Sequence, residues 1–132
     1  MTLLPIVRHM ILCQDWNVDD GASLLINVRG LLTSIRSVEL PAYPMDYAEL
    51  CLLVFLTECR GAADVMVTCV DDEHELVIYE SRTHRVHAGD DPLAVVVFPF
   101  RMTALHFPGP GVYRFELWYN AKVLAEQPLR LR

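Results

Sequence analysis

Apolar and polar residues alternate with a period of two in several separate stretches of this chain, a pattern typical of β-strands. The clearest stretch is 113–119. Successive side chains of a strand point to opposite faces, so the odd-numbered positions here share one face. That face carries four large side chains: Tyr113, Phe115, Leu117 and Tyr119. The preceding turn, 107–111, holds two prolines and two glycines, which a helix does not tolerate.

The same reading predicts seven further strands. Their ranges are 6–14, 23–33, 49–59, 65–70, 76–82, 93–105 and 122–131. The run 49–59 is apolar on both faces, which indicates a strand buried on both sides. A helix is the alternative there, but the Arg60-Gly61 pair and the β-branched run that follows favour a strand.

Breaks in these patterns give additional expectations. We expect Leu24, Ile26, Val28 and Leu32 to face inward, with a bulge or close crossing at Gly30. Pro99 cannot donate to a ladder, so its strand is expected at a sheet edge or with a bulge. Polar segments at 15–21 and 84–92 are expected as loops, and 34–48 as a long connection between two sheets. Tyr113 is expected to bond through its hydroxyl to the backbone near the preceding turn, as in a tyrosine corner.

Together these patterns predict an all-β protein: a single antiparallel β-sandwich, immunoglobulin-like or related, of seven to eight strands. With 132 residues, the chain fits one domain covering 1–132.

Several of these features occur together in a known family. They are the first strand ending at Cys13 with its Asp-rich turn, Gly30, Pro41, the apolar strand ending at Gly61, and the Pro-Gly-Val-Tyr-Arg-Phe-Glu-Leu run at 110–117. On these residues the chain resembles a family of short bacterial β-sandwich proteins known only as a domain of unknown function. The resemblance implies the fold and a bacterial source, and it implies no activity and no site residues.

The apolar content indicates self-association. Hydrophobic residues make up 53% of the chain, and the strands at 49–59, 65–70 and 76–79 lack the expected polar face. The residues that fill it are Met66, Val70, Val77 and Tyr79, with Trp118 on the outer side of its own strand. Exposed together they exceed the apolar patch of an ordinary monomer, so we expect a homodimer or higher homo-oligomer. The alternative is that the 34–48 connection covers this face within one chain.

Charge and composition narrow the choice of partners and compartment. The net charge is −6 and the 11 basic residues form no stripe, which argues against nucleic acid. No apolar stretch reaches the length of a membrane-spanning helix, and the N-terminus, broken by Pro5, Arg8 and His9, is unlike a signal peptide. The four cysteines lack metal-ligand spacing and are expected to be reduced. We therefore expect a cytoplasmic protein that contacts neither membrane nor nucleic acid.

Candidate chemistry is sparse. Acidic pairs in loops at one end of the sandwich make Asp19, Asp20, Asp90 and Asp91 candidate Ca²⁺ ligands, with solvated turn carboxylates as the alternative. His84 and His87 are three apart in a predicted loop, a spacing that indicates surface residues rather than a metal site. No catalytic motif occurs, and no cofactor is expected. We expect a non-enzymatic interaction or scaffold module; the alternative is a small-ligand or Ca²⁺-binding sandwich that uses loops at one end.

Overall fold

The computed structural model describes residues 4–19, 25–36, 40–89 and 91–132. The described residues form ten strands, two to three more than the pattern predicts. The strands are β1 (Ile6–Val18), β2 (Ile26–Leu31), β3 (Ser34–Ile35), β4 (Met45–Thr57), β5 (Ala62–Asp71), β6 (Leu76–Glu80), β7 (His84–His87), β8 (Val96–Phe107), β9 (Gly111–Tyr119) and β10 (Lys122–Leu131). No helix able to cross a membrane occurs within these four segments.

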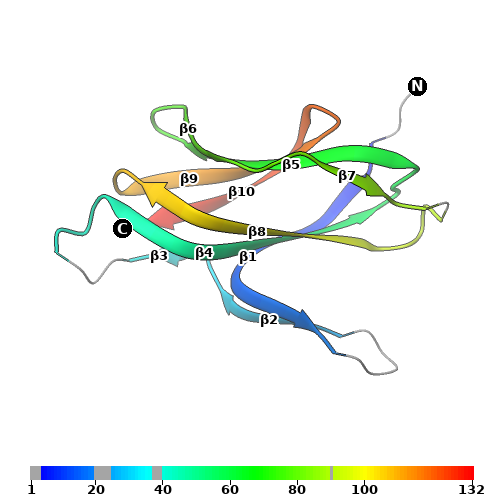
Figure 1. The fold of residues 1–132 in the computed structure, drawn as a ribbon, viewed down its shortest axis with the longest axis horizontal. Helices are drawn as coiled ribbons and strands as arrows, with labels where there is room; N and C mark the ends of the chain where they lie inside the picture. Colours follow the sequence, from blue (N-terminus) through cyan, green and yellow to red (C-terminus); the bar gives the residue numbers. More distant parts are fainter. Residues whose placement is uncertain (1–3, 20–24, 37–39, 90) are drawn as a thin grey trace.

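The strands make two sheets that face each other, so the protein is a β-sandwich (Figure 1). Sheet A has the order β2-β1-β4-β8. Sheet B has the order β3-β10-β9-β5, and both β6 and β7 pair with the far side of β5. All pairs are antiparallel except the short β3–β10 pair.

The main core lies between the sheets and is built from the alternating faces that the sequence predicts. In β9 the four predicted side chains, Tyr113, Phe115, Leu117 and Tyr119, are at most 5% exposed. The inward residues of β5 also line this core. In β8 the core residues are even-numbered from Val96 to Met102, and after Ala104, whose φ is +55°, they are Leu105 and Phe107. β4 is buried on both faces, as predicted: Leu50 and Leu52 point into the main core, and Cys51 and Leu53 into a second, smaller cluster.

The turn before β9 has the predicted tyrosine corner. The Tyr113 hydroxyl donates to the carbonyl oxygen of Gly109 at 2.7 Å. The Tyr113 ring packs edge-on against Phe107, with centroids 4.9 Å apart. Both side chains are almost fully buried, so this pair joins the end of β8 to the start of β9.

Three segments differ from the predicted elements. β1 continues through the predicted turn to Val18, because Asp15–Val18 pair with β2. The predicted loop at 84–92 begins with strand β7, held against β5. The connection at 34–48 contains β3 and the first residues of β4. In each case hydrogen bonding to a neighbouring strand outweighs local turn preference.

The predicted inner face of β2 is wrong. Val28 is 38% exposed, and Ile26 packs on the smaller cluster rather than the main core. Leu32, which follows β2, does reach the main core, and Leu24 lies outside the described residues. The reason is that β2 pairs with Asp15–Val18, the end of β1 that projects out of the sandwich.

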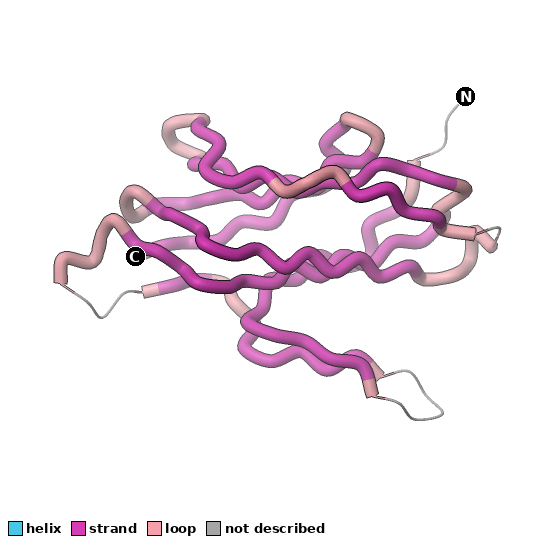
Figure 2. The backbone as a smooth tube through the Cα atoms, in the orientation of Figure 1, coloured by secondary structure: helices cyan, strands magenta, loops and turns pink. Residues whose placement is uncertain are grey.

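This departing part of the chain forms a two-stranded arm, defined here as Asp15–Val18 of β1 with Ile26–Arg29 of β2. The arm projects from sheet A on the side away from sheet B (Figures 1 and 2). In a straight strand Trp16 would lie on the same face as Leu12, which is in the main core. Trp16 packs instead on the cluster of the opposite face. β1 therefore bends between these two residues.

Gly30 lies at the bend, and the close crossing expected there is the approach of the Gln14 side chain. It faces Gln14 across the ladder, between the pairs Cys13–Leu31 and Asp15–Arg29. Its φ is +67°, a conformation that L-residues with a Cβ rarely adopt. A Cβ at Gly30 would also lie 2.5 Å from the Gln14 side chain. Glycine thus permits both the bend and the close approach of Gln14.

Candidate functional site

Two concave features stand out on the described surface, one apolar and one polar. The apolar feature, the arm groove, lies between the arm and the outer face of sheet A and has a volume of about 470 Å³. Six apolar side chains line it: Trp16, Val18, Ile26, Phe55, Val95 and Val97. The polar feature, the edge cleft, lies between β8 and the β6–β7 segment and has a volume of about 460 Å³.

The arm groove has a buried floor and exposed walls. Its floor adjoins the smaller cluster, in which Cys13, Cys51 and Leu53 are 0% exposed. Its rim is open, since Val18 is 42% exposed and Val95 is 60% exposed. The arm's own outer residues add to this apolar surface. A two-stranded ribbon is only marginally stable in water, so an arm of this kind is stabilised when it packs against another apolar surface.

A row of charges lies at the base of the arm, where Asp15 and Arg29 begin and end its two strands. Asp15 pairs with Arg29 at 3.3 Å and with Arg101 at 3.5 Å, and Arg101 also pairs with Glu49. The Trp16 backbone amide and the two arginines hold the pKa of the Asp15 carboxyl below its ordinary value. The row therefore holds two cations and two anions, and its net charge is zero.

The edge cleft forms where β6 passes into β7. Ser81 interrupts the ladder with β5: its amide donates to the Val67 carbonyl, while the Val67 amide donates to the Ser81 hydroxyl at 2.9 Å. The Ser81 hydroxyl in turn donates to the Arg82 carbonyl at 3.0 Å. These bonds fix an irregular segment opposite β8. Nine residues line the cleft: Tyr79, Glu80, Ser81, Arg82, His84, Pro99, Phe100, Arg101 and Thr103.

Of the four candidate Ca²⁺ ligands, only Asp19 and Asp91 lie within the described residues, so the predicted group stays a prediction. Asp20 and Asp90 lie outside the described residues. Asp19 is exposed at the tip of the arm, and the Asp91 carboxylate accepts a hydrogen bond from the Leu93 amide at 2.9 Å, as in a solvated turn. Among the residues that the structure describes, no three His, Cys, Asp or Glu side chains are placed to hold a metal.

The histidines have separate environments. His84 and His87 lie on β7 rather than in a loop, and their odd spacing on a strand places them on opposite faces. His84 contacts Phe100 edge-on, at 6.1 Å between centroids. His9 contacts Phe55 in the same manner, and His106 bonds Asp46 at 2.6 Å.

The cysteine thiols are all free and buried. Burial is the main cause that raises the pKa of Cys13, Cys51 and Cys59, and it raises that of Cys69 to about 12. A reactive thiol needs the opposite environment, one that favours the thiolate.

One titrating pair lies in the β5–β6 turn. Burial acts to raise the pKa of the Asp71 carboxyl, but hydrogen bonds from the His74 ring and from the His74 and Glu73 amides lower it overall. The same 2.9 Å bond raises the pKa of His74 above 6.5. The contribution of His74 to stability is thus present below 6.5 and is lost as pH rises through its raised pKa. That of Asp71 is present above 3.8 and is lost as pH falls through its lowered pKa.

We predict that replacing Asp71 by asparagine lowers the pKa of His74 toward its ordinary value, because the negative acceptor is gone. An NMR titration of the His74 ring protons measures this directly, with exposed His87 as the internal reference. A His74 titration curve unchanged in the Asp71→Asn variant would contradict the pairing.

The sequence patterns do not locate either concave feature. Each joins residues from segments that are far apart in the chain, and the arm groove also depends on a bend that changes which residues share a face. Gly30 is the one signal that marks the bend. Arg82 and Phe100 carry no motif that would connect them.

Comparisons with known proteins identify the family of this chain. No curated protein matches the chain. A solved structure, described as the crystal structure of a beta-glucosidase from Listeria innocua, is similar with a TM-score of 0.48 and 10% identity. The match covers 76% of this chain and 14% of that chain, so this protein spans about one seventh of that length. Residues 9–132 match a family described as a family of unknown function (DUF6941), and the chain therefore belongs to that family.

Proposed function

We propose that this protein is a non-enzymatic interaction or scaffold module, and that it associates with a second copy of itself through the arm groove. The observation that carries the proposal is the projecting arm with an open apolar groove beneath it. Leu25 and Leu31, which flank the β2 part of the arm in sequence, are 56% and 66% exposed. Covering these residues removes apolar surface from water, which is the main driving force of association.

The surface that carries the proposal is not the one that the sequence pattern indicates. β4 lies in sheet A, whereas β5 and β6 lie in sheet B, so their outer faces do not form one patch. Val70 is 3% exposed, and Trp118 donates through its indole nitrogen to the Thr68 hydroxyl at 2.9 Å. Val77 is 58% exposed on β6 of sheet B, but it lies apart from the arm. The proposal of self-association therefore rests on the outer face of sheet A.

The alternative cover for this face, the 34–48 connection, lies elsewhere in its described part. Tyr43 packs against the main core, and its hydroxyl donates to the carbonyl oxygen of Arg132 at 2.7 Å. Trp16 and Ile26 of the arm contact the smaller cluster of sheet A instead.

The net charge of the chain opposes self-association, but the charges beside the groove do not. Each chain has a net charge of −6, so two copies repel at long range. The charge row beside the groove is neutral and contains both signs, so a two-fold arrangement can pair its cations with its anions. A two-fold axis also lets each arm enter the groove of the other copy.

Aspartate substitutions on the groove test the proposal. Val95→Asp places a charge on the rim at an exposed position, so the monomer fold is expected to persist. Val123→Asp on β10 of sheet B is the matched control, because Val123 is 44% exposed but lies away from the groove. In a sedimentation-velocity dilution series, Val95→Asp is expected to weaken self-association by at least about tenfold, and Val123→Asp to leave it unchanged. Equal association of both variants would refute the arm groove as the interface.

The four free, buried thiols are consistent with a reducing compartment, and we propose a cytoplasmic location and a bacterial source on that basis and on the family resemblance.

A further inference from the structure

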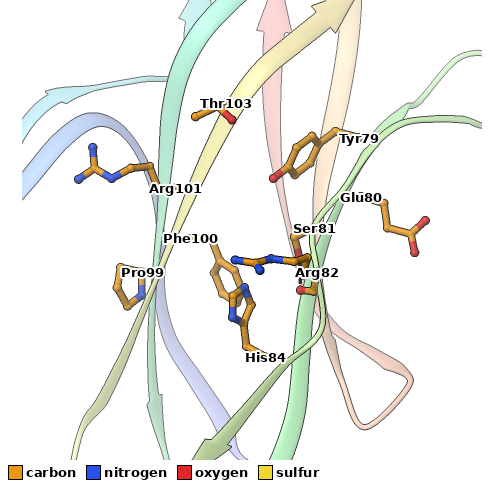
Figure 3. A pocket seen from close by; sticks show the side chains of 9 residues that line it. All are labelled: Tyr79, Glu80, Ser81, Arg82, His84, Pro99, Phe100, Arg101 and Thr103. Atoms are coloured by element: carbon orange, nitrogen blue, oxygen red, sulfur yellow. Dashed lines mark hydrogen bonds between the residues drawn. The ribbon is translucent and has the colours of Figure 1, made fainter.

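The edge cleft presents hydrogen-bond donors toward its interior. Figure 3 shows the Arg82 side chain extending from the β6–β7 segment toward β8, over Phe100 and beside His84. The side chains of Tyr79 and Thr103 face each other across the upper part of the same opening. Guanidinium, phenol and hydroxyl groups all donate, and a guanidinium cannot accept. The lining therefore favours a ligand rich in acceptors.

The other charged residues of the lining turn away from the opening. The Glu80 carboxylate points to the opposite side of its strand (Figure 3). The Arg101 guanidinium is on the outer face of sheet A, paired with Glu49 and Asp15. Arg82 itself enters no ion pair within the described segments, although acidic residues outnumber basic ones in the chain, 17 to 11. The cleft thus holds one cation directed inward and no inward carboxylate among its described residues.

Two ring systems make the floor of the cleft rigid. Phe100 is 5% exposed and anchored in the main core, and His84 packs edge-on against it. Arg82 lines the same cleft, and its planar guanidinium presents its donors in a fixed fork that matches two oxygens of an anion. Small-ligand sites place a few polar groups so that they converge on the ligand, and the volume of the edge cleft, about 460 Å³, falls in the range of such sites.

We infer that the edge cleft binds a small oxyanion, a carboxylate or a phosphate group, with Arg82 as its main ligand. Arg82 engages two oxygens of the anion through its planar fork. The Tyr79 and Thr103 hydroxyls are within the same opening and donate to the remaining oxygens or to the ligand body. This site is separate from the arm groove, and neither depends on the other.

Calorimetric titration of the full chain tests the inference and identifies the source of the oxyanion. The probes are inorganic phosphate and succinate, each titrated at millimolar concentration in a background of constant chloride. We expect saturable binding of one of them with one site per chain. Saturation by phosphate alone indicates a phosphate ligand, and saturation by succinate alone indicates a carboxylate.

Arg82→Gln and Arg85→Gln form the matched pair of variants. Both arginines are exposed and three residues apart, but Arg85 pairs with Asp64 at 3.1 Å, away from the cleft. Loss of a bidentate charged contact is expected to weaken binding at least about tenfold in Arg82→Gln, while Arg85→Gln keeps the affinity of the original protein. Absence of saturable binding by both probes, or equal binding by both variants, would overturn the inference.

Discussion

Replacing Phe107 by alanine is expected to lower the free energy of unfolding by about 4 kcal/mol, the typical loss for a buried aromatic side chain. Phe107 is 0% exposed and pairs with Met45 across the ladder. Its ring also supports Tyr113 at 4.9 Å. The substitution thus opens a cavity where sheet A meets the turn into sheet B, and the surrounding strands cannot collapse to fill it without moving the turn.

Urea denaturation followed by circular dichroism measures this loss, at one fixed protein concentration, because the proposed self-association would also stabilise the folded chain. Tyr113→Phe serves as the comparison. It keeps the ring and removes only the hydrogen bond to Gly109, so it should cost about 1 kcal/mol. If Phe107→Ala unfolds completely, Phe107→Leu, with an expected cost of about 1.5 kcal/mol, keeps the position measurable. Equal small losses for all three variants would contradict the packing at this turn.

Replacing Arg114 by alanine is expected to cost about 2 kcal/mol. Its guanidinium lies among four carboxylates on the outer face of sheet B and is 18% exposed. The four partners are Asp72 at 2.7 Å, Glu75 at 2.6 Å, Glu116 at 3.3 Å and Glu126 at 3.8 Å. The hydrogen bonds that Arg114 donates to Glu75 and Asp72 hold the pKa of Arg114 above its ordinary value. Alanine leaves the four carboxylates facing one another with no cation between them.

The effect at Arg114 has two checks. Arg85→Ala removes a single exposed ion pair, with Asp64, and should cost no more than about 0.5 kcal/mol. Added salt screens the repulsion among the four carboxylates, so the loss in Arg114→Ala should shrink between low and high ionic strength. A loss no greater than that of Arg85→Ala, with no dependence on salt, would mean that solvent already screens the cluster.

The sequence predicts those strands whose own alternation of apolar and polar residues determines which side chains are buried. The alternation of β9 and the double-sided burial of β4 follow from side-chain size at each position. β7 is missed because its four residues include only one apolar side chain, Val86, and its order comes from pairing with β5. β3 is missed because a strand of two residues is too short to show an alternation of apolar and polar side chains.

The candidate sites are harder to predict for a geometric reason. The arm groove exists because β1 bends after Cys13 and turns Trp16 toward the outer face of sheet A, so alternation counted along the strand gives the wrong face. The edge cleft exists because the edges of two sheets face each other, which places Arg82 opposite Phe100. Neither relation is encoded in the spacing of residues along the chain.

The central claim is that the arm groove joins two copies of this chain, and the molar mass of the unmodified protein in solution tests it most directly. Light scattering after gel filtration at micromolar concentration is predicted to give twice the 15.0 kDa mass of one chain. A mass of 15.0 kDa that does not rise with concentration would contradict the claim.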